Sequence, residues 1–259
     1  MKTVQEIKTD IDVLVRKQGN QGALKLGDIL DDIVDSVQEI NNSLDKFKAQ
    51  ITNVATFHAA VPTRATEIVF AFSGDVDLTG YTKSGSVGEG IDVYADGTKY
   101  AVISAKIIYA PENSAEFFRN YTVLTSLDLS NFNTTNVTNM NSMFNKCLAL
   151  TSLDLSNFNT TNVTNMSNMF RGCVALTSLD LSNFNTSNVT DMSNMFRECA
   201  NLTTIIAGDW SASVTSTNMF NGCTSLVGGN GTAYDSSHTN ASYAHIDVAD
   251  NPGYFTAPA

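Results

Sequence analysis

One cluster of histidines and carboxylates lies near the C-terminus, and its members are Asp235, His238, His245, Asp247 and Asp250. Side chains of these types can ligate a metal ion or exchange protons with a substrate. Their spacing matches no zinc signature, and a polar loop gathers such residues by chance. We therefore expect neither a metal site nor a catalytic site here. A carbohydrate-active enzyme with its site in this segment is the alternative from another functional class.

A second candidate is a row of aspartates that recurs at a constant interval, Asp128, Asp154 and Asp180. If they stacked on strands about 4.8 Å apart, their carboxylates could hold a cation. The row ends at Ile206, and its neighbours are Thr and Ser, which favours a solvated polar face. The chain has no glycine-rich phosphate loop and no nucleophile elbow. We expect no enzyme, no catalytic residue, no metal and no cofactor.

The elements that must position these residues are written as a repeat. Leu-Thr-Ser-Leu-Asp-Leu-Ser-Asn-Phe begins at Leu124, Leu150 and Leu176, which are 26 residues apart. The cysteines keep the same phase, except that the last of the four, Cys223, arrives two residues early. A fixed period of this length predicts a solenoid, in which each coil buries its apolar side only by stacking on its neighbours.

Within a coil, Leu153 and Leu155 would share one face of a short strand, with Asp154 on the other. Val163, Met166 and Phe170 fall at i, i+3 and i+7, which predicts a short helix. An aromatic residue follows each Leu-x-Leu and predicts a buried spine in place of an asparagine ladder. The spine residues are Phe132, Phe158, Phe184 and Trp210. The cysteines in common phase are expected to be buried thiols rather than disulfides.

The repeated nonapeptide, Asn-Val-Thr-Asn-Met-Ser-Asn-Met-Phe and Gly172-Cys173 resemble the BspA-like leucine-rich-repeat surface proteins. The lead-in 99–111 and the tail 251–255 resemble the caps of that family. The resemblance implies surface display and recognition of a host-surface protein or glycan, without catalysis. Solenoids bind along extended faces, so the exposed sheet face is the recognition candidate. Its expected residues are Asp128, Asp154, Asp180, Thr151, Thr177 and Thr203.

Upstream of the repeat, apolar residues alternate by three and four through four heptads. This spacing predicts a coiled coil, and its a and d residues favour three or more strands. We expect a homotrimeric stalk, and the alternative is a helical hairpin that folds back on its own chain. The expected oligomerisation residues are Leu26, Leu30, Ile33, Val37, Ile40, Leu44, Phe47, Ile51 and Val54.

The segment Val4–Ala23 resembles N-terminal segments of structural proteins in crAss-like gut phages. The first residues, 1–6, have no apolar h-region and no cleavage site, so we do not expect them to be a signal peptide. Together these features favour a phage virion fibre, a head or tail appendage, that docks on other virion proteins through residues 1–23. Its localisation would be the virion. The alternative is a bacterial BspA-like surface adhesin, at the cell surface, whose leader is absent here.

The predicted fold class is α+β, with N-terminal coiled-coil helices, a small β cap, a leucine-rich-repeat solenoid and a C-terminal cap. The corresponding ranges are 1–55, 56–114, 115–226 and 227–259. In the β cap, Glu67–Phe72 reads as a buried strand, and Asp96-Gly97 predicts a hairpin. The net charge of −11 would repel phosphate backbones, so we expect no nucleic-acid partner. No apolar run reaches the length of a membrane span, so no membrane insertion is expected.

Overall fold

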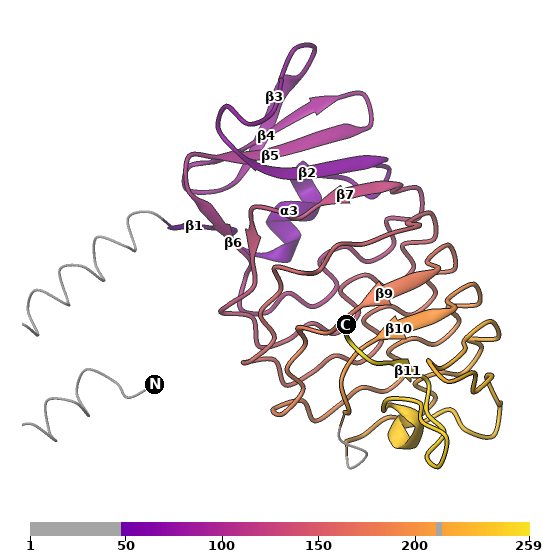
Figure 1. The fold of residues 1–259 in the computed structure, drawn as a ribbon. Helices are drawn as coiled ribbons and strands as arrows, with labels where there is room; N and C mark the ends of the chain where they lie inside the picture. Colours follow the sequence, from indigo (N-terminus) through magenta and orange to yellow (C-terminus); the bar gives the residue numbers. More distant parts are fainter. Residues whose placement is uncertain (1–47, 211–213) are drawn as a thin grey trace, which may run out of the picture. The chain divides into compact units, whose positions relative to one another are not determined.

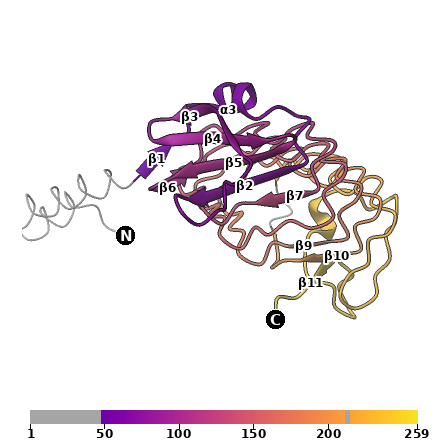
Figure 2. The same ribbon diagram turned by 90° about the horizontal axis from the view of Figure 1, so that it is seen from above.

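Apolar and polar residues alternate through most of residues 67–104, and these residues form a sheet. The computed structural model describes residues 48–210 and 214–259 of the chain. The sheet has five strands in the order β3-β4-β5-β2-β7, which Figure 2 shows side by side. Their bounds are β2 Glu67–Phe72, β3 Thr82–Gly88, β4 Ile91–Asp96, β5 Lys99–Ser104 and β7 Ser126–Asp128.

Two of the sequence predictions for this sheet are confirmed. Strand β2 has the expected bounds, Glu67–Phe72. Strands β4 and β5 form the expected antiparallel hairpin, with Asp96 opposite Lys99. Gly97 adopts a left-handed φ of 60° in the two-residue loop, a conformation that glycine reaches without a Cβ clash. Strand β2 pairs in parallel with β5 on one side and with β7 on the other, so the sheet joins the lead-in to the first coil of the repeat.

Helix α3, Val54–Ala60, packs beneath this sheet (Figure 1). It begins at Asn53, whose side chain accepts a hydrogen bond from the Thr56 amide. It ends shortly before Pro62, which cannot continue a helix. Phe57 is fully buried, and its ring lies 4.3 Å from that of Phe117. The helix therefore closes one end of the apolar interior of the coils.

The remaining strands are short and form two further three-stranded sheets. One has the order β1-β6-β8 and the other the order β11-β10-β9. Their bounds are β1 Lys48–Gln50, β6 Ile107–Tyr109, β8 Phe132–Asn133, β9 Ser178–Asp180, β10 Thr204–Ile206 and β11 Phe255–Thr256. A single 3-10 turn, η1 Ala241–Tyr243, lies in the C-terminal segment. Strands β7, β9 and β10 lie along one side of the stacked coils (Figure 1).

The coils are joined by main-chain hydrogen bonds that alternate in direction along the chain. Ser142 and Phe144 donate to carbonyls of the next coil, at distances of 2.9 Å in both cases. Met143 and Asn145 instead donate to carbonyls three residues back in their own coil. Residues 142–145 thus form consecutive turns, and every second amide among them donates a hydrogen bond to the next coil. Parallel bridges join the same position in successive coils, namely Asn113, Asn139, Asn165, Asp191 and Thr215.

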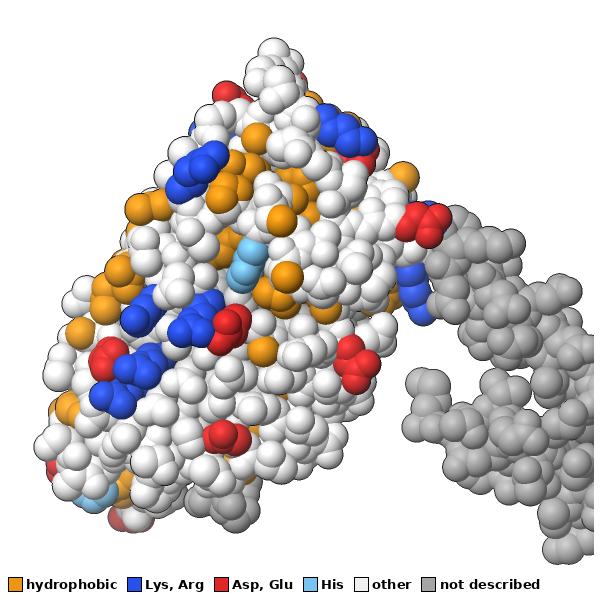
Figure 3. All heavy atoms as spheres, turned by 180° about the vertical axis from the view of Figure 1, so that it is seen from behind, with side chains coloured by type: hydrophobic (Ala, Val, Ile, Leu, Met, Phe, Trp, Pro, Cys, Tyr) orange, Lys and Arg blue, Asp and Glu red, His pale blue; other side chains and the backbone are white. Residues whose placement is uncertain are grey.

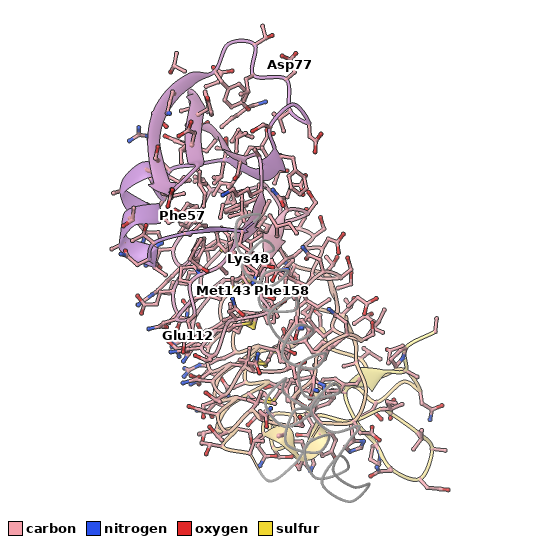
Figure 4. The ribbon with its side chains drawn as sticks, turned by 90° about the vertical axis from the view of Figure 1, so that its left-hand side faces the viewer. Lys48, Phe57, Asp77, Glu112, Met143 and Phe158 are labelled. Carbon is pink, nitrogen blue, oxygen red and sulfur yellow. The ribbon has the colours of Figure 1, made fainter. Side chains whose placement is uncertain are left out.

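The interior of the stack is a continuous apolar core. Figure 4 shows Met143 and Phe158 inside it. Successive coils superpose a ladder of parallel phenylalanine rings with centroids 5.4–5.7 Å apart, formed by Phe118, Phe144, Phe170, Phe196 and Phe220. The predicted aromatic spine is confirmed as buried, since Phe132, Phe158, Phe184 and Trp210 are each at most 8% exposed.

The predicted α+β fold class is wrong. The described residues hold one α-helix, α3, and three sheets, so this part of the chain is mainly β. The strand-plus-helix coil of a leucine-rich repeat is also absent from it, because the expected helix over Val163–Phe170 is a run of turns. Asn168 has a left-handed φ of 57°, and its amide donates to the next coil instead of along a helix axis. Turns of three residues satisfy the same apolar spacing.

The coiled-coil prediction is wrong where the structure describes its end. Lys48–Gln50 is a strand, and Ile51 is fully buried with its amide bonded to the Tyr109 carbonyl, 3.0 Å away. Val54 is the first residue of α3 and packs on the core. The Ile51 side chain is therefore not available to sister helices, and Val54 packs against the core of its own chain. The other seven predicted oligomerisation residues lie outside the described residues.

Candidate functional site

The aspartate row lies on the side of the stack that carries β7 and β9. Asp128 and Asp180 end these strands, and Asp154 occupies the same position in the coil between them. All three are exposed. Each carboxylate accepts a hydrogen bond from the amide two residues later, at 2.8, 2.9 and 3.0 Å in Asp128, Asp154 and Asp180. These are Asx turns, which fix the bend that follows the strand position.

The Asx turn also has an electrostatic effect on Asp154. The amide and side chain of Ser156 hold the pKa of the Asp154 carboxyl below its ordinary value. Hydrogen bonds to the charged form of a carboxylate stabilise that form. Asp154 is therefore an anion at neutral pH that is held in place on an exposed surface.

The strand ladder on this side is interrupted between β7 and β9. Residues 125–133, 151–159 and 177–185 have the same sequence. The first copy pairs with β2 and the third with β10. The middle copy forms no strand, and residues 151–154 make no main-chain hydrogen bond to a neighbouring coil. Position in the stack must cause this difference, because the sequences are identical.

A cleft of about 520 Å³ opens at this interruption. Its polar lining consists of serine hydroxyls, two carboxylates and one amide, with two leucines between them. The lining residues are Ser152, Leu153, Asp154, Leu155, Ser156, Ser178, Asp180, Ser182 and Asn183. The lining includes no cation, so the cleft is acidic. Such a set of donors and acceptors beside a small apolar patch suits an uncharged, hydroxyl-rich ligand.

The structure brings only part of the predicted recognition face together. Asp154 and Asp180 line the cleft, whereas Asp128 and the threonines are exposed outside it. Thr203 uses its hydroxyl to bond the Thr177 carbonyl in the preceding coil, 2.9 Å away. The Thr203 hydroxyl thus contributes to the stacking of coils. Whether these residues bind a ligand stays a prediction.

Sequence reasoning missed an asparagine ladder. Asn183 donates through Nδ2 to the carbonyls of Leu155 and Phe158, at 3.0 and 2.8 Å. Asn157 donates in the same way to the preceding coil, at 2.7 Å from the Leu129 carbonyl. The signal was an asparagine immediately before each spine phenylalanine. The aromatic spine therefore accompanies an asparagine ladder and does not replace it.

Within the described residues, four of the C-terminal histidines and carboxylates, all except Asp250, have structural partners. Asp247 is 5% exposed and accepts hydrogen bonds from the Asn230 amide, from the amide and hydroxyl of Thr232, and from the Gly253 amide. His238 pairs with Asp235 at 3.3 Å. Across the described ranges, no group of three or more His, Cys, Asp or Glu side chains could hold a metal ion. This segment closes the end of the stack through Tyr254 and Phe255, both fully buried.

Among the residues that the structure describes, no helix has the length and apolar character needed to cross a membrane.

The match to a known protein family covers less than half of the chain. No curated protein and no solved structure matches the chain. Residues 112–231, which hold the stacked coils and the cleft, match the family described as "Mycoplasma protein of unknown function, DUF285". That similarity is consistent with a BspA-like surface protein and gives no support to a phage structural protein.

Proposed function

We propose that this protein is a surface-displayed adhesion or recognition protein of the BspA-like kind. The similarity of residues 112–231 to the Mycoplasma family supports this proposal over a virion fibre. The segment that suggested a virion, Val4–Ala23, lies outside the described residues. The stacked coils would act as a rigid scaffold that holds an extended polar face toward a ligand.

The cleft at the interrupted strand ladder is the observation that carries the proposal. It combines four serine hydroxyls with the carboxylates of Asp154 and Asp180. Carboxylates accept hydrogen bonds, and hydroxyls both donate and accept them. The main-chain groups of residues 151–154 form no bonds to neighbouring coils and add further donors and acceptors. We propose that the cleft binds an uncharged glycan of a host surface.

A matched set of variants tests the cleft. Asp180→Asn and Asp154→Asn replace one carboxylate oxygen with an amide donor, while the Asx turn survives, because Asn133 and Asn159 form the same turn. Asp128→Asn makes the identical change in an identical nonapeptide outside the cleft. The full chain is applied to an array of neutral oligosaccharides. We expect the two cleft variants to bind about tenfold less, as for one lost charge-assisted hydrogen bond, and Asp128→Asn to bind normally.

Equal losses in all three variants, or no binding by the unaltered chain, would contradict the cleft proposal. Surface display is tested separately, by adding protease to intact cells that express the full-length protein. The proposal expects the protein to be cleaved while a cytoplasmic marker stays intact. Protection of both proteins would contradict surface display.

A further inference from the structure

The cations of the stacked coils are gathered in one column. Residues 107–259 contain four Lys or Arg residues, namely Arg119, Lys146, Arg171 and Arg197. Each comes one or two residues before a buried Tyr or Cys of the repeat and so occupies nearly the same place in its coil. The Lys146 amide donates to the Arg171 carbonyl and the Gly172 amide to the Arg197 carbonyl, both at 2.8 Å. Main-chain bonds thus hold neighbouring cations side by side (Figure 3).

The acidic side chains within this column do not neutralise it. Glu116 pairs with Arg119. Glu198 is shared, with one oxygen 3.5 Å from Arg171 Nε and the other 3.1 Å from Arg197 Nε. Lys146 is exposed and has no acidic partner in the part of the chain that the structure describes. Four cations and two carboxylates leave a net charge of +2 on this surface, in a chain whose net charge is −11.

The arginine stems are held against the protein. The Nε atoms of Arg119, Arg171 and Arg197 are buried, and their N–H groups donate no hydrogen bond of good geometry. The side chains as a whole remain 31–42% exposed, so their terminal nitrogens reach solvent. A guanidinium whose stem is packed loses less conformational entropy when it binds a carboxylate or sulfate group in a bidentate way.

The arrangement of these charges selects among polyanions. One cation per coil, repeated along the stack, matches a linear polymer that carries acidic groups at regular intervals. Leu148 and Val174, each 38% exposed, follow the column in their coils and offer apolar contact to sugar rings. A nucleic-acid duplex would bring a broad, dense phosphate surface against a chain of net charge −11, which electrostatic repulsion disfavours.

We propose that the column formed by Arg119, Lys146, Arg171 and Arg197 binds a linear sulfated polysaccharide. This surface is separate from the cleft, because none of its residues lines the cleft. The inference extends the proposed adhesive function with a second ligand class, an anionic glycan, but it stands on its own residues.

Heparin titrated into the full-length protein tests the inference, with desulfated heparin as the matched ligand. The variant Lys146→Gln/Arg171→Gln/Arg197→Gln should bind heparin at least about tenfold more weakly. Lys83→Gln/Lys99→Gln removes two cations of the five-stranded sheet, which pair with Asp92 and Glu67, and should bind normally. Glu198→Gln should bind more tightly, because it removes the carboxylate that competes for Arg171 and Arg197. Added salt should weaken the wild-type complex.

Unchanged heparin binding by the triple variant would overturn the inference, as would equal binding of desulfated heparin. Tighter binding of duplex DNA or of vesicles rich in anionic lipid would overturn it in favour of another partner. A circular-dichroism melt of each variant excludes loss of folding. Asp180→Asn should leave heparin binding intact, so a failure of the neutral-glycan cleft is distinguishable from a failure of this column.

Discussion

Cys173 donates its S–H to the carbonyl oxygen of Phe144, in the preceding coil, across 3.1 Å. The same bond recurs in the other coils, from Cys147 to Phe118, Cys199 to Phe170 and Cys223 to Phe196. All four thiols are free and buried. The cysteine is small enough for the crowded interior and still supplies a donor. The Phe144 carbonyl also accepts the Cys147 amide of its own coil, at 3.1 Å, so the thiol adds a second hydrogen bond to it. Tyr121 donates its hydroxyl to Val61 at the first position of this column.

The thiols should be inert in the folded protein. Burial raises the pKa of Cys147 and Cys199 to about 12 and raises that of the other two cysteines as well. Because only the thiolate is nucleophilic, a thiol reagent at pH 8 should label none of the cysteines until the chain is unfolded. Mass spectrometry before and after denaturation measures this. Rapid labelling of the native protein would show that the interior opens.

Alkaline pH should destabilise the fold through the same thiols. Their folded pKa lies above the ordinary value of 9.0, so the neutral form is favoured in the native state. This contribution is complete below pH 9 and is lost as the pH rises toward 12. We expect the urea midpoint of unfolding to fall as the pH rises from 9 toward 12. A Cys147→Ala/Cys199→Ala variant should show a smaller fall, with each protein's midpoint compared with its own midpoint at pH 8.

Removal of one ring from the phenylalanine ladder should be costly. Phe170 is fully buried, and its ring lies 5.7 Å from those of Phe144 and Phe196. Phe170→Ala should lower the free energy of unfolding by about 3–5 kcal/mol, as for large aromatic deletions in cores. Phe72→Ala is the control, because Phe72 is 38% exposed. Equal effects of the two substitutions in urea titrations would mean that the ladder does not hold the coils together.

Several features of this interior could be predicted from sequence. The common phase of cysteine, methionine and phenylalanine predicted burial, because only one face of a stacked coil is shielded from water. The bounds of β2 followed from an apolar run between polar segments. The helix expected over Val163–Phe170 failed, because its spacing fits a run of turns equally well. The choice between them depends on bonds to the next coil, which local spacing does not encode.

The cleft could not have been found from the sequence. Its two sides are copies of a nonapeptide that occurs three times, and only the middle copy lacks strand pairing. The first copy pairs with β2 and the third with β10, and these partners are brought beside them only by the folding of the whole stack. The cationic column, by contrast, was visible in the spacing of Arg171 and Arg197, 26 residues apart. The net charge of −11 gives no indication of this local excess of cations.

Backbone strain should distinguish two residues at the same place in successive coils. Lys146 has φ 60° and Gly172 has φ 72°, both in the left-handed region. A side chain in that region costs about 1–2 kcal/mol. Glycine removes this strain but costs about 0.4–1 kcal/mol in unfolded-chain entropy. Lys146→Gly should therefore stabilise the protein by up to about 1.6 kcal/mol, by the difference of these values.

The reverse substitution is the matched comparison. Gly172→Ala should destabilise by about 1–2 kcal/mol through its φ. The added Cβ would have its nearest contact with the flexible Lys146 side chain, 3.4 Å away, and the Lys146 backbone would be at an ordinary contact distance of 3.9–4.0 Å. Lys146→Ala controls for the lost lysine and should not stabilise. Chemical denaturation of the three variants provides the measurement. Destabilisation by Lys146→Gly would show that the lysine stem, packed on Gly172, adds more to the free energy of unfolding than the left-handed φ of Lys146 takes away.

Asp247 should make the C-terminal closure sensitive to acid. Burial by itself raises the pKa of this carboxyl, but hydrogen bonds from Thr232, Gly253 and Asn230 outweigh burial and bring the pKa below its ordinary value. The carboxylate therefore stabilises the fold above the ordinary aspartate pKa, and this contribution is lost as the pH falls through the lowered value. Asp247→Asn should lower the free energy of unfolding by about 1–3 kcal/mol at pH 7, because buried donors lose an acceptor.

The pH profile separates this role from mere packing. In the unaltered protein, stability should decline as the pH is lowered below the ordinary range of a carboxyl, whereas Asp247→Asn should show a shallower decline. Asp250→Asn is the control, because Asp250 is exposed in the same segment and accepts no hydrogen bond among the described residues. Parallel acid profiles for the unaltered protein and Asp247→Asn would mean that other carboxylates govern acid unfolding and that Asp247 serves only as a hydrogen-bond acceptor.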